Sequence, residues 1–287
     1  MSEIWILGAA GRTGAAVAAQ LASSSLVLVG RDAGRLQVLA GTLGPGARAV
    51  TADGLAAIAA ALSRGNPAVV INTLGAFGET APAVIRACKP GVHYLDLAND
   101  LPSVIGLLDM HDEAAAAGKS LLTGVGFGVL GTESVVLKLC EGRPPADRVR
   151  VDMVPALDME DGMVGTALAA TIVEVLAVGG REYANGRLIR TGLGKHPEHL
   201  MLPDGTSVLT ACGPSGELEA AKRASGARFA VSASTLAPPA FARAILPVIS
   251  SLVRIKAVRN FATRRIAAIR TKAAKRTREF TWAHAQV

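Results

Sequence analysis

The residues best suited to chemistry in this sequence are three glycines close to its start. Gly8, Gly11 and Gly14 follow an apolar run at residues 4–7 and lead into an alanine-rich stretch that ends at residue 21. A strand, a glycine turn and a helix in this order bind the phosphates of a dinucleotide, because the turn lets backbone N–H groups at the helix start approach the anion. The residues expected to hold the pyrophosphate are Gly8, Ala9, Gly11, Arg12, Thr13 and Gly14.

The end of the next apolar run indicates which dinucleotide binds. Residues 26–30 read as a second strand, and Arg31 and Asp32 follow it directly. Folds that bind NAD place an acid near this point for the ribose hydroxyls, whereas an arginine clamps a 2'-phosphate in a planar, charge-assisted fork. We therefore expect NADP rather than NAD. The alternative is that Arg31 is a solvated loop residue and that the glycines serve packing alone.

These residues must be positioned by alternating strands and helices. Apolar runs and helical periodicity alternate six times in the first 125 residues, with Gly, Pro and Asn at the breaks. The expected helices are 33–43, 55–62, 81–88 and 105–117, and the expected later strands are 48–53, 68–74, 93–97 and 120–125. This alternation predicts a doubly wound parallel sheet, whose ligands bind at the carboxyl ends of the strands.

Several polar residues follow these strands and are therefore candidates for the same edge. Asp53 stands where such folds often touch the adenine, although a surface carboxylate is as plausible. We expect the segment after residue 72 to line the nicotinamide side. The residues expected to do so are Thr73, Leu74 and Gly75. The candidate proton donors are Tyr94, Asp96 and Asp100, with a structural hydrogen-bonding role as the alternative for each.

Five blocks of sequence, taken together, resemble the saccharopine dehydrogenase-like reductases, and within them the branch of trans-acting enoyl reductases. The blocks are residues 8–14, 30–32, 72–78, 93–97 and 124–128. The resemblance implies an NADP-binding Rossmann domain, an α+β substrate domain, and hydride transfer to an enoyl, lipid-type double bond or to an imine.

Three family motifs differ in this sequence. Gly75-Ala76-Phe77 stands for Gly-Pro-Tyr, Ala98-Asn99-Asp100 stands for Thr-Gly-Glu, and residues 126–133 stand for Gly-Phe-Asp-Ser-x-Pro-Ser-Asp. We expect these changes to spare cofactor binding and to alter substrate chemistry. They leave open a catalytically weak, NADP(H)-binding regulator.

The second half has a different pattern. Gly142-Arg143-Pro144-Pro145 reads as a linker, so we expect an NADP-binding domain at residues 1–145 and an α+β domain at 146–287. Residues 165–178 are apolar on most faces and predict a buried helix. Asn185-Gly186 and Asp204-Gly205 each separate two strand-like runs, which predicts two hairpins and an antiparallel sheet.

A basic segment occupies about residues 241–278. Apolar residues recur there at helical spacing, and residues 254–278 contain ten Lys or Arg and no acid, more than the net charge of +7 for the whole chain. A basic amphipathic pattern has three interpretations. The charged side is simply solvated, the helix lies on a membrane surface, or the helix binds the phosphates of a nucleic acid without specificity. The final residues, 279–287, read as a strand cut short, so we expect a truncated C-terminus.

Composition limits the other classes of function. Half of the 287 residues are hydrophobic, and residues 1–3 lead into a strand without a basic leader, so we expect a cytoplasmic protein, peripheral at the inner membrane surface. Cys88, Cys140 and Cys212 are dispersed, which suits reduced thiols, and we expect no metal at the His196 and His199 pair. As partners we expect a small-molecule or lipid-like substrate, a membrane surface and a second copy of the chain, and no specific nucleic acid.

Overall fold

The computed structural model describes residues 2–156, 161–236, 245–272, 275 and 278–287. Its contacts divide the chain into two units. Unit 1 is Met1–Ala98 with Pro102–Val125, and unit 2 is Asn99–Leu101 with Gly126–Val287. The division falls earlier than the boundary expected at residue 145, because the helix at Phe127–Cys140 packs against helix Gly216–Ser225 of unit 2.

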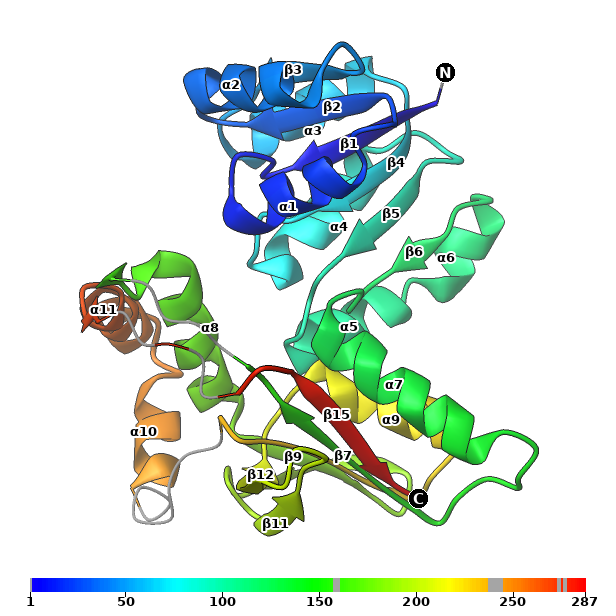
Figure 1. Cartoon of the computed structure of the whole chain (residues 1–287), viewed down its shortest axis with the longest axis vertical. Helices are drawn as coiled ribbons and strands as arrows, with labels where there is room; N and C mark the ends of the chain where they lie inside the picture. The colour runs from blue at the N-terminus through cyan, green and yellow to red at the C-terminus, as the bar shows by residue number, and fades with distance from the viewer. Residues whose placement is uncertain (1, 157–160, 237–244, 273–274, 276–277) are drawn as a thin grey trace. The chain divides into compact units, whose positions relative to one another are not determined.

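Unit 1 is a parallel sheet with helices on both faces, as its sequence predicts (Figure 1). The strand order is β3-β2-β1-β4-β5-β6, so β1 lies between β2 and β4 at the point where the chain reverses direction across the sheet. The strands are β1 (Glu3–Leu7), β2 (Leu26–Gly30), β3 (Ala47–Thr51), β4 (Pro67–Asn72), β5 (His93–Asp96) and β6 (Leu121–Leu122). The helices are α1 (Arg12–Gln20), α2 (Ala33–Leu43), α3 (Gly54–Arg64), α4 (Phe77–Ala87), α5 (Leu101–Leu108) and α6 (His111–Ala116).

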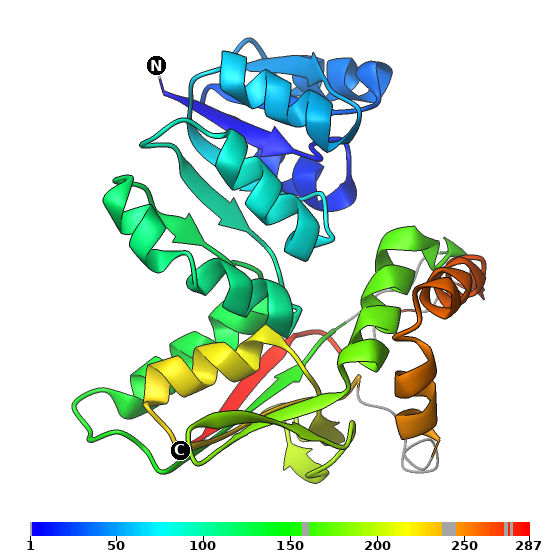
Figure 2. The same ribbon diagram turned by 180° about the vertical axis from the view of Figure 1, so that it is seen from behind.

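Two cores, one on each face, hold this sheet. Ile6 and Leu28 point to one side, where they pack with Leu36 of α2 and with Ala18 of α1. The intervening positions point to the other side. That core joins α3 and α4 to the sheet through residues that include Trp5, Leu7, Val29, Ile58, Leu62, Val84 and Ile85. Figure 2 shows this second side, with α3 and α4 in front of the strands. Burial on both faces explains the nearly continuous apolar runs of the strands.

Local details of unit 1 differ from the sequence prediction. The helix expected at 105–117 is two helices, since the chain turns at Asp109 and Met110 between α5 and α6. The helix expected at 81–88 begins four residues earlier, at Phe77, after Ala76 in a left-handed conformation. Strand β6 is shorter than the predicted 120–125.

Unit 2 is built on a seven-stranded sheet. The strands are β7 (Arg148–Val154), β9 (Gly180–Ala184), β10 (Arg187–Thr191), β11 (Glu198–Met201), β12 (Ser207–Cys212), β13 (Phe229–Ser234) and β15 (Trp282–Gln286). Both predicted hairpins are present, as β9–β10 and β11–β12. The sheet is mixed rather than antiparallel throughout, because β13 pairs with β7 in parallel. The final predicted strand is β15, which pairs with β7.

The helices of unit 2 form two groups. Helices α7 (Phe127–Cys140) and α9 (Gly216–Ser225) lie side by side on one face of the sheet (Figures 1 and 2). Helices α8 (Gly165–Val178), α10 (Leu246–Leu252) and α11 (Lys256–Ala267) pack together, and β8 (Gly162–Met163) pairs with β14 (Arg270–Thr271) beside them.

Two predictions for these helices were wrong in part. Helix α8 is buried along one face only, at Ala169, Val173 and Ala177, while Ile172 is exposed. The basic amphipathic segment is two helices, which meet at the turn around Val253. Residues 241–244 of that segment lie outside the described residues.

The β9–β10 turn provides a test of backbone conformation. Asn185 and Gly186 have φ angles of 50° and 76°, as a type I' turn requires, and a Cβ on Gly186 would meet no atom within 4 Å. We expect Gly186→Ala to destabilise unit 2 by about 1 kcal/mol, because only the left-handed φ angle opposes the methyl group. Denaturant unfolding followed by circular dichroism measures the change.

Gly41→Ala is the matched control. Gly41 lies inside α2, and a Cβ there also meets no atom within 4 Å. Because this glycine is helical, we expect the substitution to stabilise unit 1 by about 0.5 kcal/mol. The same sign for both substitutions would contradict the assigned conformations.

Candidate functional site

The turn between β1 and α1 needs glycine for two separate reasons. Gly8 has a φ angle of 81°, in the left-handed region that favours glycine. A Cβ on Gly14 would lie 2.4 Å from the carbonyl oxygen of Gly8 and 2.7 Å from Cα of Ala9. Only a glycine at position 14 therefore lets α1 approach the end of β1 so closely.

The start of α1 is open to an anion. Gly11 is the residue that precedes the helix, no side chain caps the first turn, and that turn contains no acid. Uncapped N–H groups and the positive end of the helix dipole favour a phosphate at this place. Gly11, Arg12 and Thr13 are exposed there. Ala9 is buried, and its N–H donates to the carbonyl oxygen of Val29 over 3.1 Å.

Two arginines stand beside this turn at the end of β2. Arg31 follows the strand and is exposed. Asp32 caps α2 by accepting the N–H of Arg35 at 3.0 Å. The guanidinium of Arg35 reaches back and donates from Nη2 to the carbonyl oxygen of Ala10 over 2.6 Å. The sequence analysis missed Arg35, although its position one helical turn after Arg31 was a usable signal.

Asp53 lies at the same edge of the sheet. It precedes α3, is exposed, and its side chain does not cap the helix. The neighbouring N–H of Ala52 donates to the carbonyl oxygen of Gly30 over 2.8 Å, which fixes the end of β3 against the end of β2. The structure therefore places Asp53 on the carboxyl edge that also holds Arg31.

The segment after β4 lies against the glycine turn. Thr73 donates both its N–H and its hydroxyl to the carbonyl oxygen of Leu7, over 2.9 and 2.8 Å. A Cβ on Gly8 would lie 2.9 Å from Thr73 Oγ1. Gly75 follows with a φ angle of 78°. The hydroxyl of Thr73 is thus used to join β4 to β1, while Leu74 and Gly75 are partly exposed at the edge.

A buried polar network around Asn72 holds residues 73–75 in place. Asn72 donates from Nδ2 to Thr80 Oγ1 and to the hydroxyl of Tyr94, over 3.0 and 2.9 Å. Its Oδ1 accepts the N–H of Leu74 at 3.0 Å, and Thr80 donates to the carbonyl oxygen of Gly75 over 3.0 Å. The network therefore fixes the backbone that carries residues 73–75.

The same network accounts for two of the candidate proton donors. The Tyr94 hydroxyl donates to Asp96 Oδ2 over 3.0 Å, and Asp96 Oδ1 accepts from Ala98 N–H and from the Thr123 hydroxyl. Tyr94 and Asp96 are each 1% exposed. Burial, and then the charge of Asp96, raise the pKa of Tyr94 far above its usual value. The structure gives these two residues a structural role and does not support a catalytic one.

Asp100 belongs to unit 2, where its backbone bridges to Ser215 at the start of α9. Close to it in the sequence, Asn99 contacts a buried acid of α9. With its amide turned to donate, Asn99 Nδ2 lies 2.7 Å from Oε2 of Glu217, which is 2% exposed. Burial raises the pKa of Glu217, against hydrogen bonds from Ser215 and Asn99 that lower it. The sequence analysis did not single out Glu217.

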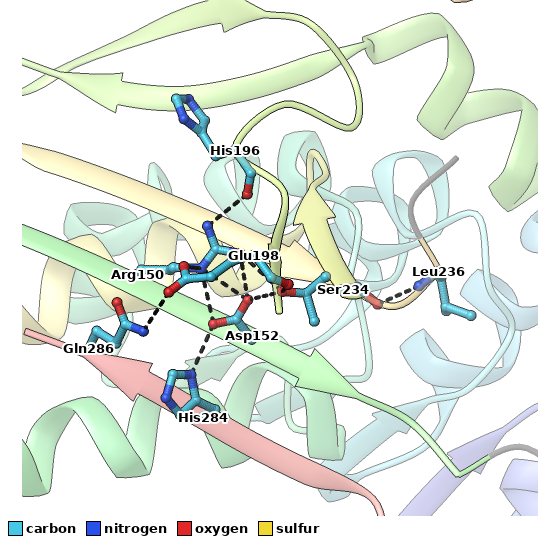
Figure 3. A network of polar contacts seen from close by, with 9 residues as sticks. Arg150, Asp152, His196, Glu198, Ser234, Leu236, His284 and Gln286 are labelled. Atoms are coloured by element: carbon cyan, nitrogen blue, oxygen red, sulfur yellow. Dashed lines mark hydrogen bonds and ion pairs between the residues drawn. The ribbon is translucent and has the colours of Figure 1, made fainter. Parts of the chain in front are cut away.

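A second buried carboxylate, Asp152 on β7, organises the opposite part of unit 2 (Figure 3). Asp152 is fully buried, and it accepts from Arg150 Nη2 at 2.8 Å and from the Thr210 hydroxyl at 2.7 Å. Nδ1 of His284 lies 3.0 Å from Asp152 Oδ2. Arg150 also pairs with Glu198 at 3.0 Å. These contacts join β7 to β11, β12 and β15, and no local sequence pattern indicates them.

One of the two histidines considered for metal binding has an acidic partner. His196 Nε2 lies 2.7 Å from Glu182 Oε2. Within the described ranges, no group of three or more His, Cys, Asp or Glu is placed to hold a metal ion.

Burial raises the pKa of the Cys88 thiol to about 11 and that of Cys212 to about 12. The helices of the described segments include none with the length and hydrophobicity needed to span a membrane.

Comparison with known proteins agrees with this description. No family model matches the chain. Over 146 residues it is 29% identical to the trans-acting enoyl reductase of Mycobacterium leprae (strain TN), a match that covers 48% of this chain and 35% of that protein. The apo structure of saccharopine dehydrogenase (L-Glu forming) from Saccharomyces cerevisiae superposes with a TM-score of 0.56 and 14% identity. That match covers 90% of this chain and 59% of the dehydrogenase.

These matches support the resemblance to the saccharopine dehydrogenase-like reductases. The structural match shows that the chain has the saccharopine dehydrogenase fold, a Rossmann-like parallel sheet with a further sheet. The sequence match is to a reductase, and both matched proteins are named as oxidoreductases. The matched part of the chain spans 35% of the length of the enoyl reductase and 59% of the length of the saccharopine dehydrogenase.

Tyr94→Phe separates a structural role from a catalytic one. The substitution removes the donor to buried Asp96 Oδ2 and one of the two acceptors of Asn72 Nδ2, which keeps Thr80 Oγ1, so we expect a loss of about 1–3 kcal/mol in the free energy of unfolding. Reductase turnover per folded molecule should change less than threefold. A hundredfold loss of turnover without loss of stability would restore Tyr94 as a proton donor.

Glu217→Gln tests the buried acid of unit 2. Because the folded pKa of Glu217 is raised, its favourable contribution is present below the unfolded value near 4.5 and is lost as the pH rises through the folded value. We expect the glutamine variant to have a higher melting temperature than the parent at pH 7 and little difference at pH 4. Thermal unfolding at both pH values measures this.

A lower melting temperature for Glu217→Gln than for the parent at pH 7 would mean that ionised Glu217 stabilises unit 2. Glu141→Gln is the control, because Glu141 is an exposed acid. We expect it to leave both melting temperatures nearly unchanged.

Proposed function

We propose that the chain is an NADP(H)-dependent oxidoreductase, because it has the fold of saccharopine dehydrogenase and is 29% identical over 146 residues to an enoyl reductase. Its reaction is hydride transfer to an activated double bond of an enoyl, lipid-type substrate or to an imine. The observation that carries the proposal is the open start of α1, flanked by the guanidinium of Arg35 on Ala10.

The residues of unit 1 fit a nicotinamide dinucleotide. Gly8, Gly11 and Gly14 give the backbone the shape that a pyrophosphate requires, and Arg12 and Thr13 begin the helix that faces it. We assign exposed Asp53, at the carboxyl edge of the sheet, to the adenosine side. We assign Leu74 and Gly75 to the nicotinamide side, with Thr73 acting through its bond to Leu7.

The preference for NADP rests on charge at the end of β2. β2 ends in Gly30 rather than in an acid, and Asp32 uses a carboxylate oxygen to cap α2. Arg31 is exposed beside it, and Arg35 is held close by the Ala10 carbonyl. Two guanidinium groups at this place favour a 2'-phosphate through charge-assisted hydrogen bonds.

When bound, the nicotinamide supplies the hydride, and the protein supplies position and electrostatics. The buried Asn72 network fixes residues 73–75, so the edge that faces the ring is rigid before any ligand binds. Tyr94 and Asp96 are used inside this network, so the proton donor, where one is needed, is another residue or water.

A regulator that binds NADP(H) without turnover is the second candidate. The burial of Tyr94 and Asp96 favours it, since these two candidate acids of unit 1 are not available to a substrate. Tight binding of NADPH without oxidation in the presence of any enoyl or imine substrate would select this candidate. Oxidation of NADPH with either substrate class would select the enzyme.

Substitution of the two arginines tests the cofactor assignment. We expect Arg31→Ala and Arg35→Ala each to weaken NADPH binding by about 10-fold or more, because each removes a guanidinium from the proposed 2'-phosphate site. NADH binding should change less than threefold in Arg31→Ala, and less than NADPH binding in Arg35→Ala, which also loses the hydrogen bond to the Ala10 carbonyl oxygen. Titration calorimetry with both dinucleotides measures the two affinities.

Arg86→Ala is the control, because Arg86 is an exposed arginine on α4 in the same unit. We expect it to leave both affinities unchanged. Equal losses for NADPH and NADH in the Arg31 and Arg35 variants would refute the 2'-phosphate site. No heat with either dinucleotide for the folded parent would refute the proposed function.

A further inference from the structure

The surface of α10 carries an apolar row that is exposed among the described residues of unit 2. Helix α10 turns Leu246, Ser250 and Val253 inward, where they are less than 10% exposed. Its other side and the turn that follows carry five aliphatic residues that are 36–60% exposed, beside exposed Ser251 and Arg254. These aliphatic residues are Ile245, Val248, Ile249, Leu252 and Ile255. Contiguous aliphatic exposure of this kind marks an interaction surface.

The apolar stripe of helix α11, in contrast, packs against α8. Val258, Ala262 and Ile266 pack against Val173, Leu176 and Ala177 of α8. The apolar residues predicted from helical spacing therefore have two environments: those of α11 pack in the interior, and those of α10 are exposed. The exposed apolar residues lie within residues 245–255.

One arginine, Arg254, directly precedes the last residue of this row, and two more arginines are grouped with it. Arg181 on β9 and Arg190 on β10 are direct cross-strand partners, an arrangement that repulsion between like charges disfavours. Arg254 lies in the turn between α10 and α11 and donates to the carbonyl oxygen of Ala177 over 3.3 Å. Burial, and then the charges of Arg190 and Arg254, lower the pKa of Arg181. Arg181 is therefore close enough to Arg190 and to Arg254 to be repelled by both.

These charges are not neutralised within the described segments. The ion pairs found there leave Arg181, Arg190 and Arg254 without a carboxylate, whereas the nearby Arg259 pairs with Glu174 at 3.4 Å. A cluster of unpaired guanidinium groups is held here at an energetic cost, which an external anion would relieve.

We propose that this surface, the α10 face, docks on an anionic lipid bilayer. The α10 face comprises the aliphatic row of residues 245, 248, 249, 252 and 255 together with Arg181, Arg190 and Arg254. The row enters the boundary between headgroups and acyl chains, and the arginines bind lipid phosphates. Aliphatic side chains beside cations suit this boundary, because one ligand satisfies both.

Charge argues against the other occupants. A second copy docked about a two-fold axis would bring the same arginines together. A nucleic acid would pair with the arginines but would leave the aliphatic row in water, and the row contains no aromatic side chain for stacking on bases. The proposal does not depend on the cofactor or on the reaction of unit 1.

Flotation with lipid vesicles tests the proposal on the whole 287-residue chain. We expect binding to vesicles of phosphatidylcholine mixed with phosphatidylglycerol, weaker binding at high salt, and little binding to phosphatidylcholine alone. Leu252→Asp should weaken binding at least tenfold, since it places a charge in the apolar row. Arg190→Gln should weaken it about fivefold, the loss for one cation near an anionic surface.

Two control variants match these substitutions elsewhere. Val38→Asp changes an aliphatic residue of α2 that is 72% exposed, and Arg86→Gln removes an exposed arginine of α4. Both should bind as the parent does. Circular dichroism checks folding, and Arg190→Gln should keep or raise the melting temperature, because it removes a repulsion.

Three outcomes would overturn the proposal. The first is no binding to the anionic vesicles by the folded parent. The second is equal binding by Leu252→Asp and Val38→Asp. The third is a dimer by light scattering that Leu252→Asp converts to a monomer while vesicle binding is absent, which would assign the α10 face to a second copy. NADPH titration of the same samples reports separately on unit 1.

Discussion

The contact between Gly14 and Gly8 is the constraint on which unit 1 depends. Helix α1 lies so close to the end of β1 that a single methyl group at position 14 would overlap the carbonyl oxygen of Gly8. This approach sets where the first turn of α1 begins, and the hydroxyl of Thr73 then fixes the end of β4 to the end of β1. The place where a phosphate fits is a result of backbone packing, with few side chains involved.

Buried polar groups supply the remaining precision in both units. Around Asn72, five side chains or backbone groups at the ends of β4 and β5 satisfy one another away from water. Around Asp152, an arginine, a threonine and a histidine do the same for the larger sheet. Such networks are costly when any partner is missing, so each defines one arrangement of its strands. Neither network needs a ligand to be complete.

Local patterns in the sequence were sufficient for much of unit 1. The range of α2 and the order of strands and helices follow from periodicity, and the glycine turn follows from three residues and their neighbours. Contacts between distant residues were not accessible in this way. Arg35 is 25 residues from Ala10, and its role depends on how α2 packs beside the turn. Tyr94 looked available because strand ends are usually exposed, but Asn72 and Asp96 enclose its hydroxyl. The amphipathic period of residues 241–278 did not reveal that its apolar residues divide between an interior and a surface.

The pairing of β15 with β7 has a consequence for how the protein is made. His284 and Asp152 are 132 residues apart, and β7 is enclosed only when β15 joins it. In unit 1, β2, β3 and β5 each pair with the strand one helix before them, β6 pairs with the strand two helices before it, and β4 pairs with β1. That unit therefore has its partners soon after it leaves the ribosome. Unit 2 keeps a carboxylate-bearing central strand with one open side until its last strand is synthesised. We therefore expect nascent chains to depend on chaperones through unit 2, at a stage when unit 1 already has its native sheet.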